Sequence, residues 1–247
     1  MRSLNEKINE LKTIIKKSER ICVFTGAGIS CPSGIPDFRS ENGIYKTKSR
    51  FGYPPEKMLS HSFFEEHTEF FFDFYRSQMV FQNAKPNRAH KYFASLEEKG
   101  KKVTVVTQNI DGLHQAAGSS NVVELHGSVL RNYCQNCKKS FSLDYVMKAE
   151  KIPRCDCGGI VKPDVVLYEE PLSENAIDRA ITAIENADAL IVVGTSLSVY
   201  PAASYIRFFK GSDLVLINKG ETRFDSLSTL SFNADITDVV SALEGNE

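Results

Sequence analysis

The sequence predicts an α/β protein built on a parallel β-sheet that helices cover on both faces. Four short apolar runs, at residues 21–25, 102–107, 189–193 and 214–217, have the length and composition of buried strands. Helical segments separate them, which favours a parallel sheet. Small or polar residues follow all four runs. A parallel sheet would gather these ends at one edge and suit them to bind a ligand, whereas any single end could be an ordinary helix cap or turn.

Length and composition allow one large domain, or a large domain with a small insert. The chain has 247 residues, of which 42% are apolar and 25% charged. Thirty basic residues nearly balance 31 acidic ones, and the net charge is -1. This balance predicts no direct nucleic-acid binding and no membrane partner, although it leaves room for a local basic patch.

The N-terminal sequence predicts an amphipathic helix and not a targeting segment. Ser3 and Glu6 have the spacing of a capping box, and the acids Glu6 and Glu10 argue against a transit peptide. No apolar run is long enough for a membrane helix. We therefore expect a soluble, cytoplasmic protein. The apolar face of the predicted helix consists of Leu4, Ile8, Leu11 and Ile15.

Four of the six cysteines form two close pairs and indicate a metal site. The pairs are separated by 17 residues, a spacing typical of a zinc ribbon. Four thiolates close a tetrahedral zinc site and leave no place for a catalytic water, so we expect one structural zinc ion. The alternative is a set of four reduced thiols. The predicted ligands are Cys134, Cys137, Cys155 and Cys157.

A zinc ribbon alone could belong to a nucleic-acid-binding module. Residues 131–162 carry seven basic and three acidic side chains, a local charge of 7 − 3 = +4. No aromatic residues interleave with them to form a base-stacking platform. A solvated surface is therefore the better interpretation.

The loop after the first predicted strand contains Gly26, Ala27 and Gly28. Glycines at this place let a backbone approach a pyrophosphate, but the signal alone is weak. Cys31 occupies the place of the third glycine of the dehydrogenase fingerprint. Basic residues at 46–50 stand where a ribose-binding acid would be expected, so a hydride-transferring dehydrogenase is disfavoured.

An ordered set of further motifs resembles the sirtuin family of NAD-dependent protein deacylases, specifically its bacterial members of single-domain length. The resemblance runs from about Ile21 to the C-terminus. The motifs are Gly26-Ala-Gly-Ile-Ser30, Gly34-Ile-Pro-Asp-Phe-Arg39, Thr107-Gln-Asn-Ile-Asp-Gly-Leu-His114, Glu124-Leu-His-Gly127, Gly194-Thr-Ser-Leu197 and Pro201-Ala-Ala203.

The resemblance implies a Rossmann-like, doubly wound large domain made of residues 1–45, 85–130 and 165–247. A smaller domain would combine a helical insert at 46–84 with the zinc ribbon at 131–164. NAD would be consumed as a co-substrate, and an acylated-lysine protein or peptide would meet it in the cleft between the domains. We expect a monomer.

The same resemblance implies the NAD contacts. Residues of the glycine loop, with Phe38 and Arg39, would line the phosphates and nicotinamide ribose. Ile110 and Asp111 would hold the carboxamide. The full set is Gly26, Ala27, Cys31, Phe38, Arg39, Gln108, Asn109, Ile110, Asp111, His126, Gly194, Thr195, Ser196, Asn218, Asp235 and Ile236.

His126 and Asn109 are the implied catalytic residues. In the family scheme the acyl oxygen captures the ribose carbon as nicotinamide leaves, and His126 then accepts a proton from the ribose hydroxyls. Histidine suits this step because its ordinary pKa lies near neutrality. His114, although inside a motif, is interpreted as a packing residue. The peptide would add as a strand between two segments, at Val165, Val166 and Tyr168 and at Ser198, Val199 and Tyr200.

Three positions depart from the family pattern. Cys31 replaces a common threonine, and Glu169 replaces a common glycine beside the peptide groove. Members that remove succinyl or malonyl groups carry Tyr-x-x-Arg, whereas Tyr75 is followed at that spacing by Gln78. We therefore expect a preference for neutral acyl groups, acetyl first. Two alternatives stay open: a mono-ADP-ribosyltransferase using the same NAD site, and a non-catalytic zinc-ribbon binding module.

Overall fold

The computed structural model describes residues 2–37 and 52–245, so Phe38, Arg39 and residues 46–50 lie outside the described part. Its large sheet has six parallel strands in the order β3-β2-β1-β7-β8-β9. Taken in chain order, this is the 3-2-1-4-5-6 arrangement of the Rossmann fold. The strands are β1 (Arg20–Thr25), β2 (Lys102–Thr107), β3 (Val122–Glu124), β7 (Ala189–Val193), β8 (Asp213–Asn218) and β9 (Leu230–Asn233).

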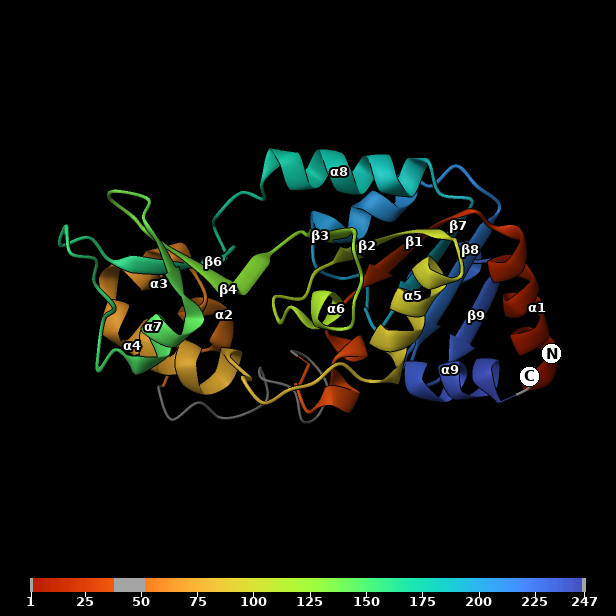
Figure 1. Cartoon of the computed structure of the whole chain (residues 1–247), viewed down its shortest axis with the longest axis horizontal. Coiled ribbons are helices and arrows are strands. Elements are labelled where there is room, and N and C mark those ends of the chain that lie inside the picture. Colours follow the sequence, from red (N-terminus) through yellow and green to blue (C-terminus); the bar gives the residue numbers. More distant parts are fainter. Residues whose placement is uncertain (1, 38–51, 246–247) are drawn as a thin grey trace.

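Helices cover both faces of this sheet (Figure 1). On one face α1 (Leu4–Lys17), α5 (Arg88–Glu98) and α9 (Ile236–Glu244) share a buried apolar core with the strands. On the other, α8 (Glu174–Glu185) and the 3₁₀ helix η4 (Ala202–Phe208) bury a second core. Strand side chains point alternately to the two faces, so β1, β2, β7 and β8 each contribute buried residues to both cores. The predicted doubly wound α/β fold is confirmed.

The N-terminal helix begins as its sequence predicts. The Ser3 hydroxyl accepts a hydrogen bond from the Glu6 amide at 3.3 Å, and the Glu6 carboxylate accepts one from the Ser3 amide at 2.6 Å. Three of the four residues predicted for its apolar face, Ile8, Leu11 and Ile15, are buried, whereas Leu4 is exposed. No helix within residues 2–37 and 52–245 is long and apolar enough to cross a membrane.

A smaller module lies beside the large sheet and has its own core (Figure 1). Its antiparallel sheet has the order β5-β4-β6. Most of the aromatic residues at 63–81 are buried in this core, as helix packing predicts. The module contains β4 (Gly127–Cys134), β5 (Ser140–Ser142), β6 (Val161–Val165), α2 (Pro55–Met58), α3 (His61–Glu66), α4 (Thr68–Phe74), the π-helical turn η3 (Tyr75–Met79) and α7 (Leu143–Lys148).

Two strands cross the predicted domain boundaries. β4 begins before residue 131, and β6 ends at 165, so neither boundary coincides with the end of a strand. The division of the chain at 130/131 and 164/165 therefore stays a prediction. The first strand of the small sheet, β4, starts at Gly127, directly after His126.

Candidate active site

A cleft of about 1520 Å³ opens at the carboxyl ends of the parallel strands. It lies where β1 and β7 are neighbours and the strand order reverses, the usual ligand position in an open α/β sheet. Loops from both modules line it, including the glycine loop, residues 108–113, His126, 165–172, 194–196 and 199–201. The four strand ends singled out from the sequence therefore do converge.

The glycines of the first loop have a packing role that the sequence alone did not reveal. A Cβ atom on Gly28 would lie 2.7 Å from the Gly194 Cα atom, and one on Gly194 would lie 2.4 Å from the Ile29 nitrogen. The loop after β1 thus packs directly on the loop after β7. Gly194 also has a positive φ of 60°, which favours glycine.

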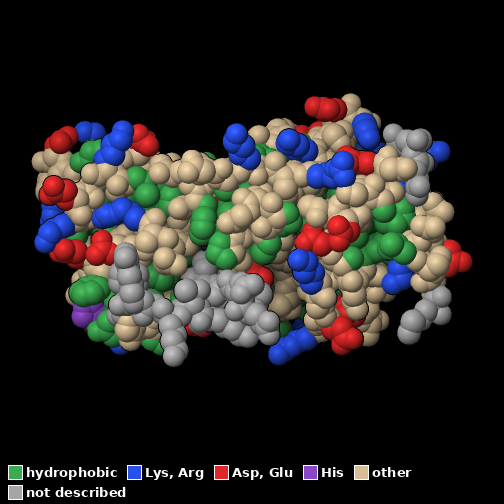
Figure 2. Space-filling model, turned by 90° about the horizontal axis from the view of Figure 1, so that it is seen from below, with side chains coloured by type: hydrophobic (Ala, Val, Ile, Leu, Met, Phe, Trp, Pro, Cys, Tyr) green, Lys and Arg blue, Asp and Glu red, His purple; other side chains and the backbone are tan. Residues whose placement is uncertain are grey.

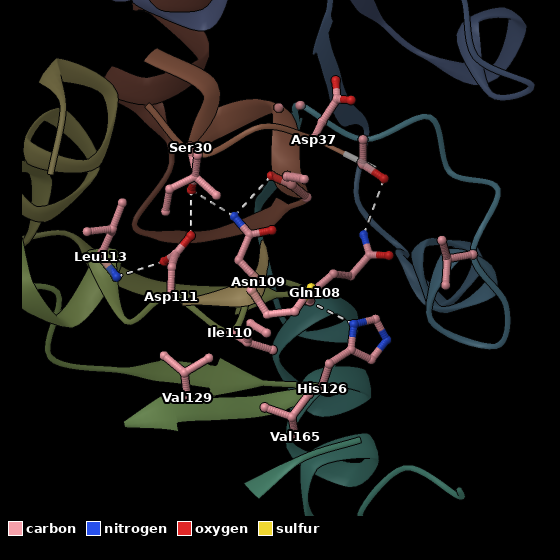
Figure 3. A pocket seen from close by; sticks show the side chains of 18 of the residues that line it. Ser30, Asp37, Gln108, Asn109, Ile110, Asp111, Leu113, His126, Val129 and Val165 are labelled. Carbon is pink, nitrogen blue, oxygen red and sulfur yellow. Dashed lines mark hydrogen bonds between the residues drawn. The ribbon is translucent and has the colours of Figure 1, made fainter. Parts of the chain in front are cut away.

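Asn109 anchors a buried polar network beneath the cleft (Figure 3). Its side-chain nitrogen donates to the Gly26 carbonyl at 3.2 Å and to the Ser30 hydroxyl at 3.1 Å. The Ser30 hydroxyl donates in turn to Asp111 Oδ2 at 2.7 Å. Ser30 was not among the predicted site residues, although it closes the Gly26–Ser30 motif. That position was the signal that could have identified it.

Asp111 faces the cleft and also holds the start of α6 (Leu113–Ala116). Its Oδ1 accepts a hydrogen bond from the Leu113 amide at 2.8 Å. Burial raises the pKa of this carboxyl, while the Leu113 and Ser30 hydrogen bonds act in the opposite direction. Ile110 lines the cleft beside it.

His126 lines the cleft at the junction of the two modules. Its Nδ1 lies 2.9 Å from the Gln108 carbonyl oxygen, and a carbonyl can only accept, so Nδ1 carries the hydrogen. Nε2 is therefore the basic nitrogen, and it points away from Gln108 (Figure 3). Burial lowers the pKa of His126, against the raising effect of this hydrogen bond. The imidazole is thus neutral near pH 7 and able to accept a proton.

The loops after β7, β8 and β9 carry several more residues of the predicted NAD-contact set. Thr195 Oγ1 accepts a hydrogen bond from Gln108 Nε2 at 3.2 Å, which links two strand ends. Asn218 donates to the Gly220 carbonyl at 2.8 Å. Asp235 caps α9, and its other oxygen lies 3.0 Å from Lys219 Nζ. Gly194, Ser196, Asn218, Asp235 and Ile236 all line the cleft.

The glycine-loop residues Gly26, Ala27 and Cys31 also line the cleft. The Cys31 thiol points back to the Ala27 carbonyl, with a sulfur–oxygen distance of 3.6 Å. Burial raises the pKa of this thiol. Of the predicted contacts in this region, Phe38 and Arg39 lie outside the described residues.

Two segments flank the cleft where a peptide strand was predicted. Val165, Val166 and Tyr168 of the first segment and Val199 and Tyr200 of the second line the cleft. The Val166 amide donates to the His126 carbonyl at 3.0 Å, and the Tyr168 amide and carbonyl bond Leu59 and His61. The Tyr168 backbone is thus already used within the chain. Ser198 does not line the cleft directly, but its hydroxyl lies 2.6 Å from that of Ser196.

The four paired cysteines come together in the small module. All four sulfurs lie within 4.8 Å of one another, with Cys134–Cys157 at 3.4 Å and Cys137–Cys155 at 3.6 Å. A tetrahedron with zinc–sulfur bonds of about 2.3 Å has sulfur–sulfur edges of roughly 3.8 Å. The arrangement therefore fits a zinc ion held by four thiolates, with no open coordination position.

Ion pairs compensate most of the local positive charge of the cysteine module. Lys139 bonds Asp156 at 2.8 Å, Lys148 bonds Asp144 at 2.7 Å, and Lys151 bonds Glu69 at 3.1 Å. Arg131 pairs with Glu124 and Asp164, and Lys162 pairs with Glu170. On the face seen in Figure 2, basic and acidic side chains likewise alternate. This pattern is typical of a solvated surface.

A known protein family matches the part of the chain that forms the cleft and the cysteine cluster. A sequence model described as the Sir2 family matches residues 26–201, which contain most of the cleft and all four paired cysteines. The chain belongs to the Sir2 family. Sir2 is the family to which the motifs of the sequence pointed, so that prediction is confirmed.

Relatives within the Sir2 family resemble the chain over nearly its whole length. A protein of Clostridium acetobutylicum named NAD-dependent protein deacetylase is 61% identical, covering 96% of this chain and 98% of its own. One of Clostridium tetani with the same name is 57% identical, covering 94% and 95%. A solved Sir2 structure with a p53 peptide and NAD+ superposes with a TM-score of 0.83 at 38% identity, covering 96% and 97%.

Proposed function

We propose that this chain is an NAD-dependent protein-lysine deacetylase in which His126 is the general base. The observation that carries the proposal is the basic Nε2 of His126, held by the Gln108 carbonyl in a cleft at the topological switch point of a Sir2-family fold. A relative that is 61% identical carries the name NAD-dependent protein deacetylase. Another solved Sir2 structure, with a deacetylated p53 peptide and 3′-O-acetyl ADP-ribose, has a TM-score of 0.88.

NAD lies along the strand ends in this proposal. The glycine loop and the Gly194–Ser196 loop hold the phosphates, and the Asn218 and Asp235 region holds the adenosine. Gln108 and Asn109 face the nicotinamide ribose, and Ile110 and Asp111 hold the carboxamide. The Asn109–Ser30–Asp111 network supports these roles because it fixes the three side chains before any ligand arrives.

The reaction transfers the acyl group from lysine to ADP-ribose. Nicotinamide leaves C1′ of the ribose with the bonding electrons, and the acyl oxygen of the substrate lysine forms a bond to that carbon. His126 Nε2 accepts a proton from the ribose hydroxyls, so the 2′-oxygen can attack the acyl carbon. Water completes the release of free lysine, and the other products are nicotinamide and 2′-O-acyl-ADP-ribose. A neutral, buried imidazole suits this proton transfer.

Zinc has a structural role in this proposal. The four sulfurs would saturate a tetrahedral ion, which cannot then bind a water or the substrate. The ion would hold the end of β4 and the turn after it to the segment between α7 and β6, and β4 begins next to His126. Metal loss is therefore expected to act on the site indirectly.

Neutral acyl groups are the proposed substrates. Tyr75 is 1% exposed, and its ring lies parallel to that of Phe71 with centroids 5.9 Å apart, so it faces the core. Arg76 donates to the Ala149 and Lys151 carbonyls. Gln78 and Met79 line the cleft instead. A tyrosine–arginine pair for an acyl carboxylate is thus missing from the described residues of this helical insert.

The deciding experiment measures nicotinamide release from NAD, with and without an acetylated peptide. Peptide-dependent release that His126→Ala abolishes supports deacetylation. Labelling of protein by ADP-ribose without acetylated peptide supports a mono-ADP-ribosyltransferase. No release in either condition leaves only a zinc-ribbon binding module. Circular dichroism and zinc content should match the wild type in His126→Ala, since His126 is a member of none of the three apolar cores and is not one of the four cysteine ligands.

A further inference from the structure

A pair of buried histidines lies behind the site and takes no part in the proposed chemistry. His90 on α5 and His114 on α6 are 0% and 1% exposed, and their ring centroids are 4.8 Å apart at an interplanar angle of 61°. Burial lowers the pKa of His90 to about 4 and that of His114 to about 3, where the charge of His90 adds to the effect. Both rings are therefore neutral near pH 7.

The hydrogen bonds around the pair fix which nitrogen of each ring carries the hydrogen. His90 Nδ1 accepts from the Asn87 amide at 3.4 Å, so the hydrogen of His90 is on Nε2. His114 Nε2 lies 3.1 Å from Thr25 Oγ1, which itself donates to Thr107 Oγ1 at 2.8 Å. Thr25 has one hydroxyl hydrogen, so His114 Nε2 must donate to Thr25. His114 Nδ1 is then a bare acceptor.

The two remaining nitrogens complement each other. Among the described residues, His90 Nε2 and His114 Nδ1 are buried and have no hydrogen-bond partner. One is a donor and the other an acceptor on adjacent rings. Leaving both unsatisfied would destabilise the fold, whereas one buried water molecule can accept from the first and donate to the second. The Ser119 hydroxyl, also buried and without a partner in the described chain, belongs to the loop bonded to the His114 carbonyl.

The other end of this chain of hydrogen bonds reaches the site. Thr25 and Thr107 are the last residues of β1 and β2 and face each other in register. Thr107 Oγ1 also accepts from the Asn109 backbone amide at 3.0 Å. The order is therefore His114 to Thr25 to Thr107, with Asn109 bonded to the last oxygen.

We propose that a buried water bridges His90 and His114, and that His114 and Thr25 are positioning residues that hold Asn109 through Thr107. The bridge fixes the tautomer in which His114 donates to Thr25. Thr25 must then donate to Thr107, which orients the Thr107 oxygen toward the Asn109 amide. Asn109 thereby keeps the backbone position from which its side chain reaches Gly26 and Ser30. The role given to Asn109 rests on the proposed function.

The kinetic test compares three variants. Thr25→Val keeps the shape but removes the hydroxyl, Thr25→Ser restores it, and Thr104→Val on the neighbouring strand β2 is the matched control. Thr104 Oγ1 bonds only the surface residue Asn121 among the described side chains, at 2.8 Å. We expect Thr25→Val to raise KM for NAD about tenfold, a loss of about 1.4 kcal/mol, with KM for the peptide unchanged. Thr25→Ser should recover most of this loss, and Thr104→Val should show none.

Two outcomes would overturn the proposal. One is a Thr25→Val enzyme that melts at a lower temperature but keeps wild-type KM for NAD, which would make the hydroxyl merely structural. The other is a long-range ¹⁵N–¹H spectrum showing His114 with its hydrogen on Nδ1. Calorimetric Kd values for NAD in the same variants distinguish failure of this proposal from failure of the proposed function. They report the effect of Asn109 positioning on NAD binding even if the wild type never deacetylates a peptide.

Discussion

The buried hydroxyl of Tyr75 provides a sharp test of how the small module is packed. The side chain is 1% exposed, and its oxygen has no hydrogen-bond partner among the described residues. Burial raises the pKa of this phenol, so it stays protonated. Leaving a buried hydroxyl unsatisfied costs about 1–3 kcal/mol, and Tyr75→Phe removes that cost.

The expected gain is worked from two opposing terms. The void left by one oxygen atom costs a few tenths of a kcal/mol, at roughly 24 cal/mol per Å³. The net change is therefore a stabilisation of about 1 kcal/mol. For a chain of this size, that corresponds to a rise in Tm of about 2–4 °C. Urea unfolding followed by circular dichroism, together with thermal melting, measures both quantities.

A matched variant should change stability in the opposite direction. The Tyr145 hydroxyl donates to the Arg154 carbonyl at 2.5 Å, so Tyr145→Phe removes a formed hydrogen bond and should lower stability. Tyr75→Phe should also leave the ratio of acetyl to succinyl turnover within twofold of the wild type, because Tyr75 faces the core. A Tyr75→Phe protein that is less stable than the wild type, or that changes this ratio, would refute the reasoning.

Three further predictions concern the base, the metal and the peptide groove. His126 must be neutral to accept a proton, and burial lowers its pKa from the ordinary 6.5, so kcat/KM should be constant near pH 7 and fall in acid with a midpoint below pH 6.5. A midpoint above pH 6.5 would contradict this. Cys134→Ser should lower zinc content and Tm together, measured by plasma emission and melting, and full zinc content would count against the four-thiolate site. The Glu169 carboxylate is bonded to the Ser62 amide at 2.8 Å and hydroxyl at 3.0 Å. It places a fixed negative charge on the cleft wall, so Glu169→Gly should lower the preference for basic over acidic flanking residues by roughly two- to fivefold in a peptide panel.

Much of the fold was predictable because its strands carry strong local signals. The four valine- and isoleucine-rich runs became β1, β2, β7 and β8. The edge strands β3 and β9 were missed, since three or four residues do not establish a pattern. Their place in the sheet depends on neighbouring strands. The zinc ligands were predictable for a different reason. Each pair of cysteines is close together in the sequence, so its spacing can be recognised without the structure.

The finer parts of the site depend on contacts between distant segments. Residue 194 must be a glycine because the backbone nitrogen of Ile29, 165 residues earlier, leaves no room for a Cβ atom there. No local sequence pattern reveals this close approach. Ser30 lies in a predicted motif, but its bond to Asp111 joins two loops from different strands. His114 was interpreted as packing, which its burial agrees with, yet its hydrogen bond to Thr25 became visible only in three dimensions.

The packing of α1 against α9 has a practical consequence for handling the protein. Both helices lie at the end of the large sheet remote from the cysteine module (Figure 1). A tether attached before α1 or after α9 would therefore leave from the same end of the molecule. An enzyme immobilised on a sensor surface through either end should present its cleft to the solution. Large acetylated proteins, and not only short peptides, could then be assayed on it.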